Sequence, residues 1–281
     1  MSLPPRVSAI NVFPVKSCGP MALEAAEVAP SGLMGDRRFL VTDADGGFVT
    51  GRRIPAMTRI QPHFDGQCLR LEAPGMPSLA VDTDTLAPRY SDVTVWRDTV
   101  AAQSCGDDAD AWISECLGGR YRLGFMGPQS HRATKGRPDQ PLGFADRFPL
   151  LGVSRESVNA LNDRLARAVT ALHFRANLVI DGGEAFQEDG WAEVRIGEAV
   201  FEVVAPCSRC VFTTVDPQRG EAAADREPFR TLAGFRRDDS GKVHFGQHLV
   251  PRITGTVRVG DCVEVLARKP KPRYVDRMAA T

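Results

Sequence analysis

Short runs of alternating apolar and polar residues, separated by glycine-containing turns, recur through much of this chain. Residues 68–71 alternate as Cys-Leu-Arg-Leu, and the Asp-Gly-Gly turn at 45–47 joins two further runs, 39–42 and 48–50. Residues 257–265 are divided by a Gly-Asp pair, which predicts another hairpin. Closely spaced short strands of this kind favour β-barrels over a doubly wound parallel sheet. The expected fold class is therefore α/β and β-rich.

Two helices interrupt the strand pattern. Asp107 is in a position to cap the first, which Gly118 would end. Ser154 can cap the second, with an apolar face that is expected to run from Val158 to Val169.

The chain has 281 residues, enough for two domains. Residues 127–141 are rich in glycine, proline and polar residues and lack periodicity, so this segment is the expected linker. We therefore expect an N-terminal barrel-like domain over 5–126, a second domain over 127–268 and a tail over 269–281.

Charge and cysteine content limit the possible environments and partners. Lysine plus arginine and aspartate plus glutamate each number 35, which argues against a nucleic-acid partner or a membrane surface. No apolar stretch approaches membrane-spanning length, and the first residues carry no signal-peptide pattern. Seven cysteines without a secretory signal suit a reducing compartment, so we expect a cytoplasmic protein.

The segment 205–217 (APCSRCVFTTVDP) carries the most specific chemical signal. A strand-like run enters it, and Cys207 and Cys210 then flank Arg209. Thiols held at the end of a strand suit a soft metal or a redox reaction, and a neighbouring guanidinium favours thiolate. The β-branched run at 211–215 is expected to be another strand.

A Cys-x-x-Cys pair alone leaves the chemistry open. A structural zinc site needs four ligands, and no histidine lies within about five residues of this pair. A thioredoxin-like pair would open a helix, whereas the residues after this pair have strand character. The remaining cysteines are scattered singly along the chain: Cys18, Cys68, Cys105, Cys116 and Cys262.

Several ordered motifs resemble one known family. The Cys-Ser-Arg-Cys segment with its Thr-Thr-Val-Asp-Pro continuation is similar to the MOSC family, the molybdenum-cofactor sulfurase C-terminal-like domains. Together with the other motifs, it resembles the MOSC proteins with an N-terminal MOSC β-barrel, namely the mitochondrial amidoxime-reducing component and its bacterial relatives. These other motifs are FPVKSC at 13–18, GLMGDRRF at 32–39, FADRFPL at 144–150, HFRANLVI at 173–180 and FGQ at 245–247. The resemblance implies an N-terminal β-barrel-like domain, then a MOSC β-barrel with a few helices, and molybdenum bound as Mo-molybdopterin.

The resemblance assigns the metal ligand and its neighbours. Cys210 would hold molybdenum, and Cys207 would be a close neighbour or structural. Ser208 and Arg209 would bond the pterin and the oxo groups, although an exposed turn explains Ser208 nearly as well. Asp216 would supply a proton or simply order the Asp-Pro turn.

Two further sets would bind the pterin and its phosphate. The first is Lys16, Ser17 and Arg37, which would reach the phosphate from the N-terminal domain and otherwise would be solvated surface groups. The second is Arg175 and Asn177, expected to alternate along a strand and share one face. The alternative for this second set is an interior salt bridge, with Asp146 or Asp181 as the acid.

The activity implied by the resemblance is reduction of small N-hydroxylated substrates: amidoximes, hydroxylamines and N-hydroxylated bases. No iron–sulfur cysteine spacing follows the expected second domain, so electrons would come from a separate donor of ferredoxin, flavodoxin or cytochrome b5 type. No pyridoxal phosphate site is expected. The alternative is a non-catalytic protein that carries molybdenum cofactor, or sulfur on Cys210.

Overall fold

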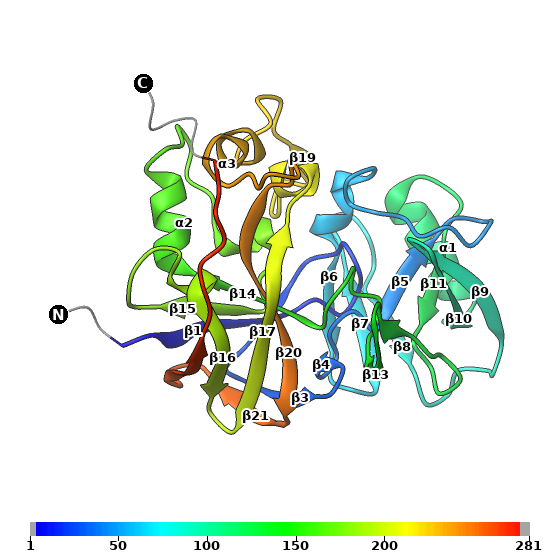
Figure 1. The fold of residues 1–281 in the computed structure, drawn as a ribbon. Coiled ribbons are helices and arrows are strands. Elements are labelled where there is room, and N and C mark those ends of the chain that lie inside the picture. Colours follow the sequence, from blue (N-terminus) through cyan, green and yellow to red (C-terminus); the bar gives the residue numbers. More distant parts are fainter. Residues whose placement is uncertain (1–3, 276–281) are drawn as a thin grey trace.

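The computed structural model describes residues 4–275, which form two β-rich lobes (Figure 1). The larger lobe contains a curled eight-stranded sheet with helices at one end, and the smaller lobe contains β5 to β11 and α1. The expected β-rich fold with barrel-like halves and few helices is confirmed.

The eight-stranded sheet draws its strands from both ends of the chain. In order across the sheet they are β2 (Met21–Leu23), β1 (Arg6–Val12), β15 (Leu178–Asp181), β14 (Leu150–Ser154), β20 (His244–Ile253), β17 (Ala199–Ser208), β16 (Trp191–Ile196) and β22 (Val263–Arg268). A bridge between Arg6 and Cys262 and a 2.9 Å bond from Val7 N to Asp261 O bring the start of β1 to the start of β22. The sheet therefore curls back on itself, as barrels do to remove their edges.

A small sheet closes the apolar core beneath these strands. It consists of β21 (Gly255–Arg258), β3 (Ala25–Ala29) and β4 (Gly32–Leu33). The hairpin expected over 257–265 is wrong, because β21 pairs with β3 whereas β22 pairs with β16. The backbone of the intervening turn bonds to other segments: Val259 N donates to Glu24 O, and Gly260 N donates to Val7 O.

The smaller lobe packs two sheets around aromatic side chains. One sheet consists of β5 (Phe39–Thr42), β11 (Arg122–Phe125), β10 (Asp98–Ser104) and β9 (Tyr90–Val95), and the other of β6 (Gln61–Phe64), β7 (Cys68–Glu72) and β8 (Leu79–Asp82). The Phe39 ring lies 4.8 Å from Phe125 and 5.1 Å from Phe64, so it joins the two sheets. Such aromatic pairs add to the stability gained by burying their area.

Both expected helices are present, with small differences at their ends. Helix α1 (Asp107–Leu117) begins after Gly106, which is its N-cap, and ends at Gly118 with φ 66°. The Ser154 hydroxyl accepts a 3.4 Å bond from Ser157 N at the start of α2 (Arg155–Asn162). This helix ends earlier than its apolar pattern predicts, yet Val169 still packs into the same core.

The remaining helices are short and lie mostly in connections. They are α3 (Phe229–Phe235) and the 3-10 helices η1 (Pro55–Arg59), η2 (Ala171–Phe174), η3 (Gln187–Gly190) and η4 (Val211–Thr214). Within residues 4–275, no helix combines the length and apolar character needed to cross a membrane.

The expected linker at 127–141 contains a two-stranded sheet, β12 (Ala133–Thr134) with β13 (Arg137–Pro141). The linker contacts both lobes: Arg132 pairs with Asp98 on β10, and Arg137 pairs with Glu202 on β17. Strands β1 to β4, from the first 33 residues, pair within the larger lobe, so the lobes do not follow chain order. The linear boundary at residue 126 stays a prediction.

Candidate functional site

A cavity of about 890 Å³ lies between the two lobes. Side chains from the N-terminal third of the chain and from the strand ends of the larger lobe line it together. All the residues predicted to bind cofactor lie on its wall: Lys16, Ser17, Arg37, Arg175, Asn177, Ser208, Arg209 and Cys210. A volume of this size is typical of small-molecule and cofactor sites.

The end of β17 separates the two cysteines into different environments. Cys207 is 7% exposed and packs into an apolar core, and burial raises the pKa of its thiol. Cys210 is exposed and lines the cavity. A thiol that must bind a soft metal has to be accessible, so the geometry favours Cys210 over Cys207 for that role.

The run after Cys210 is not the expected strand. Residues 211–214 form η4, and only then does β18 (Val215–Asp216) pair with β19 (Glu221–Ala222). The hydroxyl of Thr213 donates to Cys210 O at 3.0 Å, and that of Thr214 donates to Val211 O at 2.8 Å. These local bonds stabilise a tight turn in spite of the β-branched side chains, because threonine hydroxyls compete for backbone partners.

Arg209 extends into the interior beside the cysteines. Its Nε donates to Phe245 O at 2.9 Å and its Nη1 to Phe174 O at 3.0 Å. The buried Nη2 has no partner among the described residues, and burial lowers the pKa of the group. A buried guanidinium N–H group without an acceptor favours binding of an anion or another acceptor.

Arg175 and Asn177 reach the cavity by a different route from the one expected. The segment before them is η2, and Arg175 adopts the left-handed conformation with φ 56° before β15 begins. The prediction that they share one strand face is therefore wrong. The left-handed residue turns the chain so that both side chains still line the same cavity.

The contacts of Arg175 resemble those of Arg209. Arg175 Nη1 donates to Cys18 O at 2.7 Å, and its guanidinium lies 4.1 Å from the Phe13 ring centre. Its buried Nη2 has no partner in residues 4–275. Burial, together with the charge of Arg37, lowers the pKa of Arg175 to about 9.

The alternative of an interior salt bridge from Arg175 is not observed among the described residues. Asp181 pairs with Arg155 instead, and Asp146 pairs with Lys16.

Asn177 and Asp36 connect the two lobes. Asn177 is fully buried, and its Oδ1 accepts from Arg37 Nη1 at 2.9 Å while its Nδ2 donates to Asp36 at 3.1 Å. Asp36 also pairs with Arg37 and accepts from Phe13 N at 2.8 Å. The Arg37 guanidinium is thus fixed toward the cavity by one acid and one amide.

Lys16 is not a solvated surface charge. It is 6% exposed, and its Nζ donates to Phe144 O at 2.7 Å and to the carboxylate of Asp146. Burial lowers the pKa of Lys16. Burial also opposes ionisation of Asp146, but the charge and hydrogen bond of Lys16 outweigh it and hold the pKa of that carboxyl well below its usual range.

Backbone strain is concentrated at this cavity. Among the described residues, six non-glycine residues have positive φ, and four of them line it: Ser17 at 70°, Arg37 at 46°, Trp96 at 60° and Arg175 at 56°. Such conformations cost of order 1–3 kcal/mol each and persist where the surrounding structure imposes them, commonly at functional sites.

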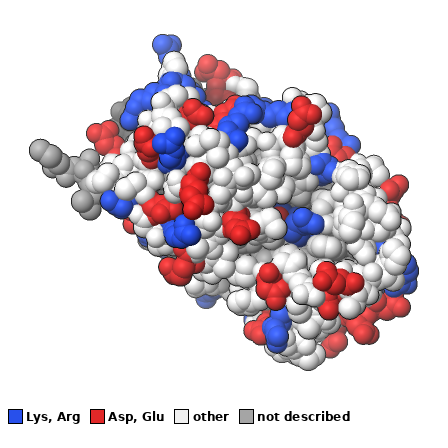
Figure 2. Space-filling model, turned by 90° about the horizontal axis from the view of Figure 1, so that it is seen from below, with Lys and Arg blue, Asp and Glu red and all other residues white. Residues whose placement is uncertain are grey.

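The cavity is strongly cationic although the chain is neutral overall. Nine lysines and arginines line it against two aspartates. On the face shown in Figure 2, by contrast, positive and negative side chains are interspersed, with a broad uncharged area between them. An electropositive cleft between apolar walls suits an anionic ligand.

Several lining residues were not singled out from the sequence. Trp96 at the β9–β10 turn donates from Nε1 to Asp146 at 3.0 Å and lies under the Arg52 guanidinium at 4.6 Å. Arg147 belongs to the FADRFPL motif, which is the signal that would have found it, and Asp146 of the same motif was considered only as a salt-bridge partner of Arg175. The others are Thr50, Arg97, Asp98, Arg132, Lys135 and His248, for which no local pattern exists.

Asp216 does not line the cavity. Its Oδ1 accepts from Gln218 N and Arg219 N, both at 2.9 Å, which is the turn role considered from the sequence. Burial opposes ionisation of this carboxyl, but these two N–H groups outweigh it and lower its pKa. The contacts therefore count against Asp216 as a proton donor at this cavity.

The donor set fits a molybdenum cofactor of the dithiolene type. Arg175 and Arg209 each have an unpartnered Nη2, and Cys210 offers one exposed thiol. Within residues 4–275, no group of three or more His, Cys, Asp or Glu side chains could hold a metal ion, so the Cys pair has no further zinc ligands there. A metal that brings two sulfurs of its own needs only one thiolate from the protein.

Two protein-family models match the chain. The MOSC N-terminal beta barrel domain matches residues 4–120, and the MOSC domain matches residues 139–264. Mitochondrial amidoxime-reducing component 1 from Xenopus laevis is 33% identical over 94% of this chain and 82% of its own length. The human protein of the same name is 33% identical over 93% of this chain and 83% of its own length. The molybdenum cofactor sulfurase of Anopheles gambiae is 32% identical over 87% of this chain, but over only 34% of its own length.

Proposed function

Because this chain belongs to the MOSC-domain proteins that carry an N-terminal MOSC beta barrel, we propose that it binds molybdenum cofactor between its lobes and reduces small N-hydroxylated compounds. The observation that carries the proposal is the convergence of eight expected cofactor residues on one cationic cavity. The names of the relatives matched over most of their length support a reductase of amidoximes, and the name of the Anopheles gambiae relative supports a link to molybdenum cofactor.

The chain's own residues would hold the cofactor by three kinds of contact. Cys210 would bind the metal through Sγ, and the free Nη2 atoms of Arg175 and Arg209 would donate to cofactor oxygens. Lys16 and Arg37 would neutralise its phosphate. The bound cofactor supplies the two-electron redox chemistry at molybdenum.

Reduction of an N–OH group to N–H consumes two electrons and two protons and releases water. Asp146 stays ionised near neutral pH because Lys16 lowers its pKa, so it does not hold a proton to donate. Burial lowers the pKa of His248 to about 3, so its imidazole is neutral there and offers no imidazolium proton. We therefore expect the protons to enter from solvent, with Lys16 and Arg37 stabilising negative charge in the cavity.

The electrons would come from a separate protein of ferredoxin, flavodoxin or cytochrome b5 type. The described cysteines are all free, and no group of three or more metal-binding side chains lies among residues 4–275 to hold a second redox centre. The cytoplasmic location stays a prediction, since several relatives are named as mitochondrial.

The test compares two exposed cysteines. Wild type, Cys210→Ala and Cys262→Ala would be purified from a host that makes molybdenum cofactor, then assayed for molybdenum, zinc and benzamidoxime reduction with reduced methyl viologen as donor. We expect near-stoichiometric molybdenum and turnover in wild type and Cys262→Ala. In Cys210→Ala, turnover should fall by about 10³-fold or more, the order of effect seen when a principal catalytic group is lost. Zinc without pterin in all three proteins would overturn the proposal.

The second candidate is a carrier of cofactor or of sulfur. Two observations support a carrier: the Cys210 thiol is exposed, and the chain is similar to molybdenum cofactor sulfurases. Stoichiometric molybdenum without reduction of benzamidoxime, hydroxylamine or an N-hydroxylated base would select the carrier and reject the reductase.

A further inference from the structure

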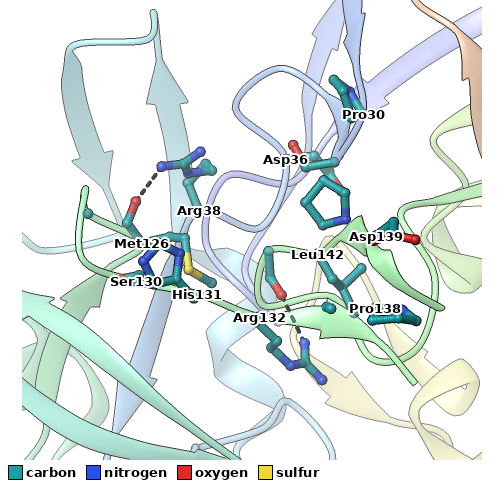
Figure 3. Close-up of a pocket in the computed structure, with 15 residues that line it drawn as sticks. Pro30, Asp36, Arg38, Met126, Ser130, His131, Arg132, Pro138, Asp139 and Leu142 are labelled. Atoms are coloured by element: carbon teal, nitrogen blue, oxygen red, sulfur yellow. Dashed lines mark hydrogen bonds between the residues drawn. The ribbon is translucent and has the colours of Figure 1, made fainter. Parts of the chain in front are cut away.

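A second cavity, of about 610 Å³, lies against the linker segment (Figure 3). Its wall comes from residues 30–38 and from residues 126–143. Arg132, Ala133 and Leu142 line both cavities, so the second lies next to the proposed cofactor site. Its other lining residues do not line that site.

Arg38 is the unusual group in this wall. Its Nη2 donates to Met126 O, as drawn in Figure 3, and its guanidinium lies 5.3 Å from the Phe125 ring centre. Its Nε is buried and has no partner among the described residues. Burial lowers the pKa of Arg38, and no carboxylate counteracts that effect. Arg38 is half-buried, and a partly desolvated cation without a counter-charge is stabilised by a ligand that supplies one.

Arg132 and Asp36, the other charged groups of this wall that are not exposed, already have hydrogen-bond and ion-pair partners. Arg132 pairs with Asp98 at 2.9 Å and donates to Gly143 O at 2.8 Å. The Asp36 carboxylate already accepts hydrogen bonds from Phe13 N and Asn177 Nδ2 and pairs with Arg37. Arg38 is therefore the charged group of this wall with a buried N–H that lacks an acceptor, whereas Asp139 and His131 lie at the exposed edge of the cavity.

We propose that this second cavity binds a small organic anion whose carboxylate or phosphate group lies against Arg38. Apolar side chains of Met126 and Leu142, with the exposed Pro138, would contact the organic part. The volume exceeds what a bare oxyanion needs and lies within the range of small-molecule sites. A guanidinium is the group best matched to planar carboxylates and to phosphates.

The test measures binding of benzoate, phenyl phosphate and inorganic phosphate by titration calorimetry. The first two probes distinguish a carboxylate from a phosphate group, and the third lacks an organic part. We expect Arg38→Met to weaken binding of the preferred organic anion by about tenfold or more, since one charge-assisted contact is lost. Arg70→Met, which removes an exposed arginine on β7, should change nothing.

Two more variants keep the result decisive. Arg175→Met alters only the cofactor cavity, and binding that is lost in this variant but kept in Arg38→Met would overturn the proposal. Pro138→Trp fills the second cavity from its exposed edge and should weaken binding as Arg38→Met does, even if the latter fails to fold. Absence of measurable binding to wild type, or equal binding in all variants, would also overturn it.

Discussion

The core of the eight-stranded sheet and the cavity at its end are built on the same strands but follow opposite rules. Strand β17 belongs to both: Phe201 and Val203 are buried among apolar neighbours, whereas Ser208 at its end lines the cavity. The core is apolar and regular, while the cavity combines positive φ angles, excess cations and unpartnered donors. The first region supplies stability, whereas the backbone strain and the unpartnered donors of the second carry a cost in stability.

Removing an apolar side chain from the core should have the largest effect on stability. Phe201 is fully buried, so Phe201→Ala should lower the free energy of unfolding by about 3–5 kcal/mol. Urea denaturation followed by circular dichroism would measure this. Val211→Ala, at an exposed apolar position, is the control and should change stability by less than about 0.5 kcal/mol. Equal losses of stability from the two changes would remove the contrast between the core and the exposed turn after Cys210.

Neutralising the buried acid between the lobes should be the next largest effect. Asp36→Asn leaves Arg37 without its counter-charge, and we expect a loss of about 3 kcal/mol. Glu264→Gln breaks an exposed pair with Arg195 and should cost less than about 1 kcal/mol. If Asp36→Asn lost no more stability than Glu264→Gln, the folded protein would not depend on an internal counter-charge for Arg37.

The imidazole of His248 should make stability depend on pH. Burial lowers its folded pKa to about 3, below the unfolded value of about 6.5. The unfolded chain therefore takes up a proton that the folded chain refuses, and the stability present above pH ~6.5 is lost as pH falls toward ~3, by up to about 1.4 kcal/mol per pH unit. Unfolding titrations between about pH 7 and pH 5 should show a shallower slope for His248→Gln. The exposed His63→Gln control should keep the wild-type slope, and identical slopes in all three proteins would contradict the prediction.

Removing a cation from the cavity should have the smallest effect on stability and the opposite sign. Arg175→Met loses one bond to Cys18 O but also removes a buried charge beside Arg37, so the cofactor-free protein should be unchanged or more stable by up to about 1 kcal/mol. Molybdenum retained after dialysis should fall at least tenfold. A clear loss of stability with molybdenum retained would assign Arg175 a structural role.

Local patterns in the sequence determined much of the fold. The alternating runs predicted a β-rich chain, and Gly118 and Ser154 were correctly placed at helix ends because capping depends on adjacent backbone groups. The ordered motifs around Lys16, Arg175 and Cys210 led to the family, and all eight expected cofactor residues line one cavity.

Only the tertiary structure decided how those motifs meet. Strand pairing put β1 beside β15 and separated β21 from β22, because barrel closure joins segments far apart in the chain. The left-handed conformation of Arg175 and the η4 turn after Cys210 replaced expected strands, since local hydrogen bonds and burial outweigh β-propensity. The unpaired charge of Arg38 has no sequence signature at all: whether a guanidinium has a counter-charge depends on which side chains surround it in the folded protein.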